Sequence, residues 1–140
     1  MTIKEIQEEI IDEFAMFDDW MERYAYMIEL GKSLPLIDAE FKTDDNIIKG
    51  CQSKVWVHAE LAENKLIFTA DSDAIITKGI IAILIRAFSN QKPADIIEAN
   101  TDFIDEIGLK EHLSPTRANG LVSMIKQLKL YAVAYQTQLN

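Results

Sequence analysis

Cys51, the single cysteine of this chain, is the residue best placed to do chemistry. It lies between Gly50 and Gln52 in a polar stretch, although a free cysteine is more often a small buried hydrophobic residue. Gly50 allows the backbone to turn tightly and leaves the approach to the sulfur open. Lys49 and Lys54 flank the loop, and a nearby cation favours the nucleophilic thiolate. Taken alone, these residues leave a reactive and a structural cysteine equally open.

Other familiar kinds of site find no support in the residues. One cysteine and two histidines, His58 and His112, cannot supply the usual zinc ligands. The five glycines are scattered singly, so no glycine-rich phosphate loop is present. Neither an HExxH metal motif nor a convincing nucleophile elbow occurs. His58 falls inside an alternating run, where a packed side chain is expected.

The acidic balance of the chain argues against nucleic acid as a partner. The net charge is −9, whereas phosphate binding needs a basic face. An anionic membrane surface is disfavoured for the same reason. Residues 1–22 hold eight acidic side chains and one lysine, so this segment is either a solvated helix face or a docking surface for a basic partner.

The chain is expected in the cytoplasm. Residues 1–10 contain no apolar segment of the secretory type. The longest apolar stretch, residues 80–85, is far shorter than the ~20 residues that a membrane span needs. With one cysteine no internal disulfide can form, which suits a reducing compartment.

The elements that must position Cys51 follow from periodicity and turn residues. Residues 3–17 have apolar side chains at helical spacing. A second helix begins after Asp19, with Glu22 completing a partial capping box, and Gly31 is expected as its C-cap. Two alternating runs, residues 54–61 and 65–71, are joined by a short polar connection, which predicts an antiparallel hairpin.

The second half of the chain is expected to cover this hairpin. Residues 74–89 are apolar nearly all round, as in a central buried helix, with Asp73 as its N-cap or else as an acidic site residue. Pro93 opens a short helix, and a loop-rich stretch follows around Phe103 and Gly108. Ser114 and Pro115 start the last helix. We therefore expect an α+β fold in one domain, 1–140, with helices packed on a small antiparallel sheet.

Four segments resemble the SufE/CsdE family of sulfur-acceptor proteins. GCQSKVWV at residues 50–57 is similar to the cysteine-loop signature of that family. DSDAIITKGIIAIL at 71–84 resembles its acidic turn and core helix. HLSPTRANGLVSMI at 112–125 resembles the start of its C-terminal helix, and WMERYAYMIELGKSLP at 20–35 its second helix. The four segments lie in the expected order and span most of the chain.

The resemblance implies a fold shared with the IscU-type scaffolds and a role in iron–sulfur cluster assembly. Members bind and stimulate a PLP-dependent cysteine desulfurase of the SufS or CsdA type. Their loop cysteine accepts the terminal sulfur of the enzyme persulfide and delivers it to a cluster-assembly scaffold complex. The matching residue is Cys51, as the persulfide carrier. The chain itself is expected to need no cofactor or metal, to act with the desulfurase rather than as a stand-alone enzyme, and to be a monomer or weak homodimer.

Arg117 matches the arginine of the family's helix-start motif. It would stabilise the sulfur anion or dock the partner, unless it is only a surface residue. Supporting roles are expected for Gly50, Gln52, Lys49 and Asp73. Lys54 departs from the neutral residue that familiar members often carry, which leaves the choice of partner open.

Three other functions compete with sulfur transfer. The chain could activate a desulfurase without covalent chemistry, with Cys51 incidental. It could be a thiol-redox protein, although it has no CxxC motif. It could be an iron–sulfur scaffold, although clusters usually need about four thiolates.

Overall fold

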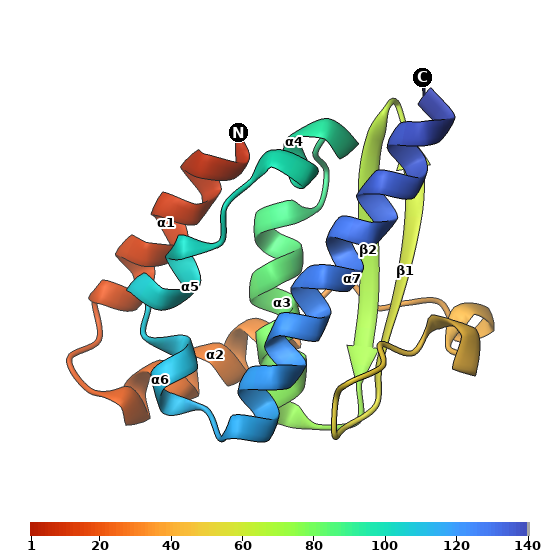
Figure 1. Cartoon of the computed structure of the whole chain (residues 1–140). Helices are drawn as coiled ribbons and strands as arrows, with labels where there is room; N and C mark the ends of the chain where they lie inside the picture. Colours follow the sequence, from red (N-terminus) through yellow and green to blue (C-terminus); the bar gives the residue numbers. More distant parts are fainter. Residues whose placement is uncertain (140) are drawn as a thin grey trace.

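The computed structural model describes residues 1–139 (Figure 1). The chain begins with two helices, passes through two 3₁₀ turns (Ala39–Phe41 and Asp44–Asn46) into a hairpin, and returns through further helices. The elements are, in order, α1 (Ile3–Ala15), α2 (Trp20–Lys32), β1 (Val55–Ala62), β2 (Lys65–Ser72), α3 (Ile75–Phe88), α4 (Pro93–Glu98), α5 (Asp102–Glu106), α6 (Leu109–His112) and α7 (Pro115–Leu139).

Helix α3 lies in the middle of the molecule, with α1 on one side, the β1–β2 hairpin on the other and α7 in front (Figure 1). The hairpin is antiparallel and in register from Val55 opposite Ser72 to Ala62 opposite Lys65. Its two-residue turn is Glu63 and Asn64, both with positive φ (51° and 66°), the conformation that tight hairpins require. The predicted α+β fold with a small antiparallel sheet is confirmed.

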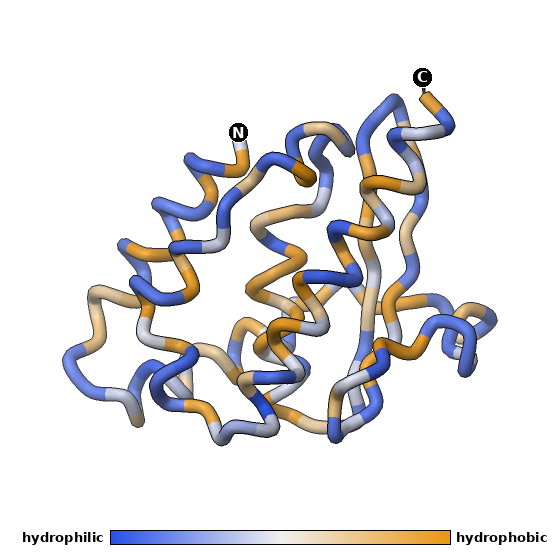
Figure 2. The backbone as a smooth tube through the Cα atoms, in the orientation of Figure 1, coloured by the Kyte–Doolittle hydropathy of each residue, from blue (hydrophilic) through white to orange (hydrophobic). Residues whose placement is uncertain are grey.

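The hydrophobic core is built around α3. Seven consecutive α3 residues from Gly79 to Ile85 are buried, which is why its sequence is apolar on every side. Figure 2 shows the hydrophobic colouring along this helix, while the outer turns of the molecule are hydrophilic. Four fully buried phenylalanines from different elements pack in the same core: Phe14, Phe68, Phe88 and Phe103.

Helices α2 and α3 cross at two glycines. A Cβ on Gly31 would lie 3.1 Å from the Gly79 nitrogen, and a Cβ on Gly79 would lie 2.5 Å from the Met27 carbonyl oxygen. The expectation that Gly31 caps α2 is therefore wrong. The helix continues to Lys32 and is capped at Ser33, because Gly31 serves a close helix crossing rather than a helix end.

The helix starts follow the local rules in most places. Thr2 and Glu5 form a full capping box at α1, and the Asp19 carboxylate accepts a hydrogen bond from the Glu22 amide at α2. Helix α1 ends at Ala15, two residues before the predicted end. Pro93 opens α4 as predicted. The prediction of a loop-rich stretch after α4 is wrong, because this stretch forms the short helices α5 and α6, whose Phe103 and Leu109 are buried.

Arg86 ties the acidic first helix to the core. Its guanidinium donates to Glu9 at 2.7 Å and also to Glu13, which accepts a further hydrogen bond from the Tyr26 hydroxyl. These contacts occupy part of the acidic face of α1, whereas Glu8 and Asp12 stay exposed. Between residues 1 and 139, no helix is long and apolar enough to cross a membrane.

Candidate functional site

Cys51 lies on a short loop that connects Ile48 to Val55, where the chain enters β1. The Ile48 amide donates to the Val55 carbonyl at 2.8 Å and closes the base of the loop. Among the described residues, no backbone group of residues 49–53 forms a hydrogen bond with the rest of the protein. The loop is therefore fixed at its ends, while its middle is positioned by side-chain packing.

Asp73 fixes the second end of the loop. Its carboxylate accepts a hydrogen bond from the Lys54 amide at 3.0 Å, and its own amide donates to the Lys54 carbonyl at 3.2 Å. The same carbonyl accepts from the Ser72 hydroxyl at 2.8 Å. The prediction that Asp73 caps α3 is wrong: Ala74 stands at the N-cap, and no side chain caps the helix. The Asp73 carboxylate holds the cysteine loop instead.

Two glycines let the loop pack closely against α7. Gly50 has φ +95°, and a Cβ there would lie 2.4 Å from the Ser123 Oγ. Gly120 faces the cysteine directly, since a Cβ on it would lie 3.4 Å from the Cys51 Sγ. The Cys51 thiol donates to the Gly120 carbonyl, with 3.6 Å between sulfur and oxygen. Thus Gly50 permits the turn, and Gly120 leaves room for the sulfur.

The thiol lines a cavity of about 50 Å³ between three segments of the chain. On this measure one water molecule needs ~10–15 Å³, whereas sites for drug-sized ligands occupy roughly 300–1,000 Å³. The cavity can therefore take one or a few atoms beside Cys51, but not a bound metabolite. Its lining comes from the cysteine loop, the first turns of α3 and the first turns of α7: Cys51, Gln52, Ser53, Thr77, Ile80, Thr116, Arg117, Gly120 and Met124.

Burial controls the protonation of the thiol. Cys51 is half-buried, and removal from water raises the pKa of its thiol above the ordinary value. The expectation that Lys49 and Lys54 lower this pKa is wrong, because both lysines are exposed and desolvation decides the shift. The free protein therefore holds Cys51 mainly as the neutral thiol at neutral pH.

Arg117 comes to the cavity through the start of α7. The Ser114 hydroxyl accepts a hydrogen bond from the Arg117 amide at 3.3 Å, which is N-cap geometry as the sequence predicts. The guanidinium has no ion-pair partner within the part of the chain that the structure describes. A free cation at the wall of the cavity can attract an anionic sulfur.

The structure brings together some of the residues expected from the sequence and separates others. Cys51, Gln52 and Arg117 line one cavity. Gly50 adjoins it, and Asp73 lies at the loop base. Lys49 is exposed at the start of the loop and does not line the cavity. The sequence did not predict the residues that the two helices contribute to the cavity lining, namely Thr77, Ile80, Thr116, Gly120 and Met124.

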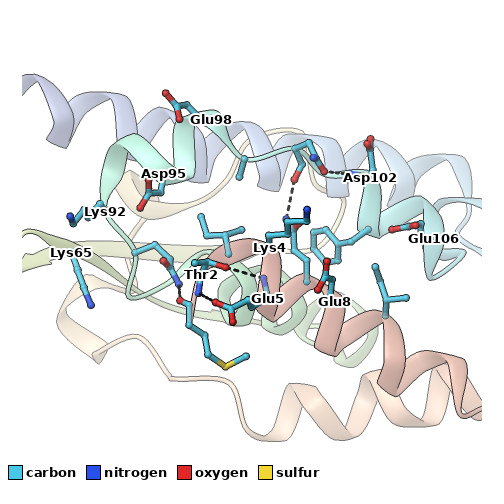
Figure 3. A pocket seen from close by; sticks show the side chains of 18 residues that line it. Thr2, Lys4, Glu5, Glu8, Lys65, Lys92, Asp95, Glu98, Asp102 and Glu106 are labelled. Carbon is cyan, nitrogen blue, oxygen red and sulfur yellow. Dashed lines mark hydrogen bonds between the residues drawn. The ribbon is translucent and has the colours of Figure 1, made fainter.

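A larger hollow lies away from Cys51. An open groove of about 930 Å³ runs beside the first turns of α1 and the helices α4 and α5. Figure 3 shows lysines and carboxylates around it, among them Lys4 and Glu8 of α1, Asp95 of α4 and Lys92 at the start of α4. It shares no lining residue with the Cys51 cavity. Within residues 1–139, no group of three or more His, Cys, Asp or Glu side chains could hold a metal ion.

The fold and the cavity together define a small α+β protein that holds one cysteine against the N-terminal turns of two helices. A family model described as SufE, Fe-S metabolism associated domain, matches residues 8–132. An uncharacterized SufE-like protein of Rhizobium meliloti is 43% identical over 127 residues, covering 87% of this chain and 91% of the relative. An uncharacterized SufE-like protein of Rhizobium etli is 44% identical over 128 residues, covering 87% and 86%.

Two further comparisons concern a longer relative and a solved structure. The Arabidopsis thaliana protein named SufE-like protein 1, chloroplastic/mitochondrial, is 35% identical over 127 residues, covering 90% of this chain and 34% of that protein. The solution structure of a hypothetical protein from Thermus thermophilus has a TM-score of 0.79 at 19% identity, over 94% of this chain and 96% of that chain. The likeness to the Thermus thermophilus structure supports the α+β fold.

This chain belongs to the SufE family, whose domain is associated with iron–sulfur metabolism. The family resemblance inferred from the four sequence segments is thereby confirmed.

Proposed function

We propose that this protein accepts sulfur from the persulfide of a PLP-dependent cysteine desulfurase onto Cys51 and passes it to an iron–sulfur scaffold complex. One observation carries the proposal: the thiol of the single cysteine lines a cavity of about 50 Å³, with room for one added sulfur atom. Membership of a family associated with iron–sulfur metabolism supports the same role.

The transfer is a thiol exchange in which atoms and electrons balance. The Cys51 thiolate attacks the outer sulfur of the donor persulfide and forms a new S–S bond. The bond between that sulfur and the donor cysteine breaks, and the donor cysteine departs as a thiolate. The transferred sulfur keeps its oxidation state, so the step needs no oxidant or reductant. Because the chain has no second cysteine, no internal thiol can strip the sulfur away.

Because the pKa of the Cys51 thiol is raised, we infer that docking of the partner helps the thiol to ionise. An unperturbed cysteine is only about 3% thiolate at pH 7, and burial lowers that fraction further for Cys51. We propose that docking moves the loop away from the Gly120 carbonyl and lets the thiol ionise. The thiol of the free protein would then react slowly until a partner docks.

The remaining loop residues have separate proposed roles. Arg117 attracts the sulfur anion from the cavity wall, and Gly50 and Asp73 set the shape of the loop. Gln52 and Lys49 are exposed and form part of the docking face, together with Lys54. We also propose a cytoplasmic location, because a free thiol suits a reducing compartment; fractionation of the source cells tests this.

Desulfurase turnover tests the role of Cys51. Alanine release from L-cysteine should rise when wild-type protein and a small reductant are added to the desulfurase of the same cell. Cys51→Ala should remove this stimulation, while Arg117→Gln should weaken it and Arg117→Lys, which keeps the charge, should weaken it less. Full stimulation by Cys51→Ala would reject covalent transfer and favour a non-covalent activator.

A further inference from the structure

Thr77 is a buried hydroxyl group without a partner. It is 5% exposed, and the other buried polar side chains of the described residues, Gln7, Ser72 and Gln91, all form hydrogen bonds. Within residues 1–139 the Thr77 hydroxyl forms none. A hydroxyl with no partner in the protein bonds to whatever occupies the space beside it, a water molecule or a ligand.

The place of Thr77 in the fold shows which space that is. It lies in the first turn of α3 and lines the same small cavity as the Cys51 thiol. The fully enclosed, unpaired side-chain atoms of the described residues are Trp20 Nε1 and His58 Nε2. The Thr77 hydroxyl is not among them and therefore keeps access to open space. The cavity is the space that this residue lines.

Several features around the cavity favour an anion. Helix α3 has no side-chain cap, so the amides of its first turn, Thr77 included, lack the usual partner. The N-terminal turn of α7 contributes Thr116 and Arg117 to the same wall. Helix N-termini carry partial positive charge, and Arg117 adds a full one. The cysteine loop adds Gln52 and Ser53 to the wall, and Ile80 and Met124 make its apolar part, where an anion needs a donor.

We propose that the Thr77 hydroxyl donates a hydrogen bond to the terminal sulfur of the Cys51 persulfide and holds that sulfur inside the cavity. The inference rests on the proposed function and names a residue that binds the carried sulfur. The Cys51 Sγ itself contacts the Gly120 carbonyl, an acceptor that favours a protonated thiol. The terminal sulfur of a persulfide, one S–S bond beyond Sγ, would enter the cavity that Thr77 also lines. In the empty protein the Gly120 carbonyl therefore accepts from the thiol, whereas in the loaded protein the Thr77 hydroxyl donates to the terminal sulfur.

Three substitutions isolate the hydroxyl. Thr77→Val keeps the shape and removes the donor, whereas Thr77→Ser keeps the donor. Thr69→Val is the control, because Thr69 lies opposite His58 in the hairpin and does not line the cavity. Cys51 of each variant is loaded with inorganic polysulfide. The Cys51 thiolate attacks a terminal sulfur of the polysulfide, and the remaining, shorter polysulfide departs. Excess reagent is removed, glutathione is added, and intact mass follows the loss of the added sulfur.

The Thr77→Val persulfide should be lost at least about tenfold faster than the wild-type persulfide, as expected for a hydrogen bond to a charged group. Thr77→Ser and Thr69→Val should stay within about threefold of wild type. With Thr77→Val, the rate at which the empty Cys51 thiol is alkylated should stay as in wild type, and the melting temperature should not fall. Equal persulfide lifetimes in wild type and Thr77→Val would overturn the inference. So would an equal acceleration of thiol alkylation, because Thr77 would then only shape the loop.

A parallel loading by desulfurase and L-cysteine separates the two proposals. If polysulfide loads Cys51 but the desulfurase does not, the proposed function fails while the lifetimes still decide the role of Thr77.

Discussion

Replacing Gly50 by alanine should release the cysteine loop from α7. Gly50 has φ +95°, a conformation that costs an alanine about 1–2 kcal/mol. The new Cβ would also lie 2.4 Å from the Ser123 Oγ and 3.3 Å from the Ser123 Cβ. The Ser123 Oγ can rotate away but the Ser123 Cβ is fixed on α7, so relieving the overlap costs roughly 1 kcal/mol, at the low end for overpacking, if the loop stays in place. The closed loop should therefore lose about 2 kcal/mol or more relative to an open one.

This loss can be measured as the accessibility of Cys51. Each ~1.4 kcal/mol changes an equilibrium tenfold, so a loss of about 2 kcal/mol raises the open population roughly 30-fold. Iodoacetamide alkylation at fixed pH, followed by intact mass, should accelerate by about that factor in Gly50→Ala. Global stability in urea should change less, because residues 49–53 have no backbone hydrogen bonds to the rest of the described protein.

A second substitution separates the two causes of the loss. Ser123→Ala in the Gly50→Ala background removes the Oγ contact and leaves the backbone strain, so the labelling rate should fall part of the way back. Ser123→Ala alone should label as wild type does. If Gly50→Ala labels within twofold of wild type, the close packing of the loop on α7 does not control access to Cys51, and the reasoning fails.

Three further predictions concern titration and stability. Burial raises the pKa of the Cys51 thiol, so half-maximal alkylation should fall above pH ~8.5 in the folded protein and return to about 8.5 in urea. The folded state then keeps the Cys51 proton to a higher pH than the unfolded state does. The free energy of unfolding relative to Cys51→Ala should therefore decline as pH rises beyond ~8.5. Gly79→Ala should lower the melting temperature by about 4–8 °C, because the new Cβ meets the fixed Met27 carbonyl oxygen, whereas Gly120→Ala should not lower it. Arg86 holds the pKa of the Glu13 carboxyl below its usual range, so Glu13→Gln should cost about 1 kcal/mol at pH 7, and this difference should vanish as pH falls below ~4.

Each of these has a result that counts against it. A Cys51 alkylation profile that does not shift on unfolding contradicts burial as the controlling factor. Equal melting temperatures for Gly79→Ala and wild type contradict the close crossing of α2 and α3. A Glu13→Gln difference that does not shrink as the pH falls below the usual carboxyl range contradicts an ionic contact with Arg86.

The hairpin, the central helix and the start of α7 could be predicted because their signals are local. Alternation of apolar residues specifies β1 and β2, and Ser114 followed by a proline marks a helix start. Gly31 was misassigned because the local rule for glycine names a helix end, while its reason for being glycine is the contact with Gly79, 48 residues away in the sequence. Helices α5 and α6 are too short for a periodic pattern and depend on tertiary packing.

The site could be predicted only as far as its own loop. Cys51 stood out by its neighbours, and Arg117 by the family motif. The protonation state could not be derived, since flanking lysines are visible in a sequence and burial is not. Asp73 was misassigned because its partner, the Lys54 amide, comes from the other side of the hairpin. A threonine inside a mostly apolar helix is the available signal for Thr77, and only the fold brings it to the cysteine.

The most direct test of sulfur transfer is intact mass under non-reducing conditions after incubation with the desulfurase of the same cell and L-cysteine. The wild-type chain should gain one sulfur atom that a reductant removes, and Cys51→Ser should gain none. A wild-type mass that stays unchanged, or an equal gain on Cys51→Ser, would contradict the role of Cys51 as the sulfur carrier.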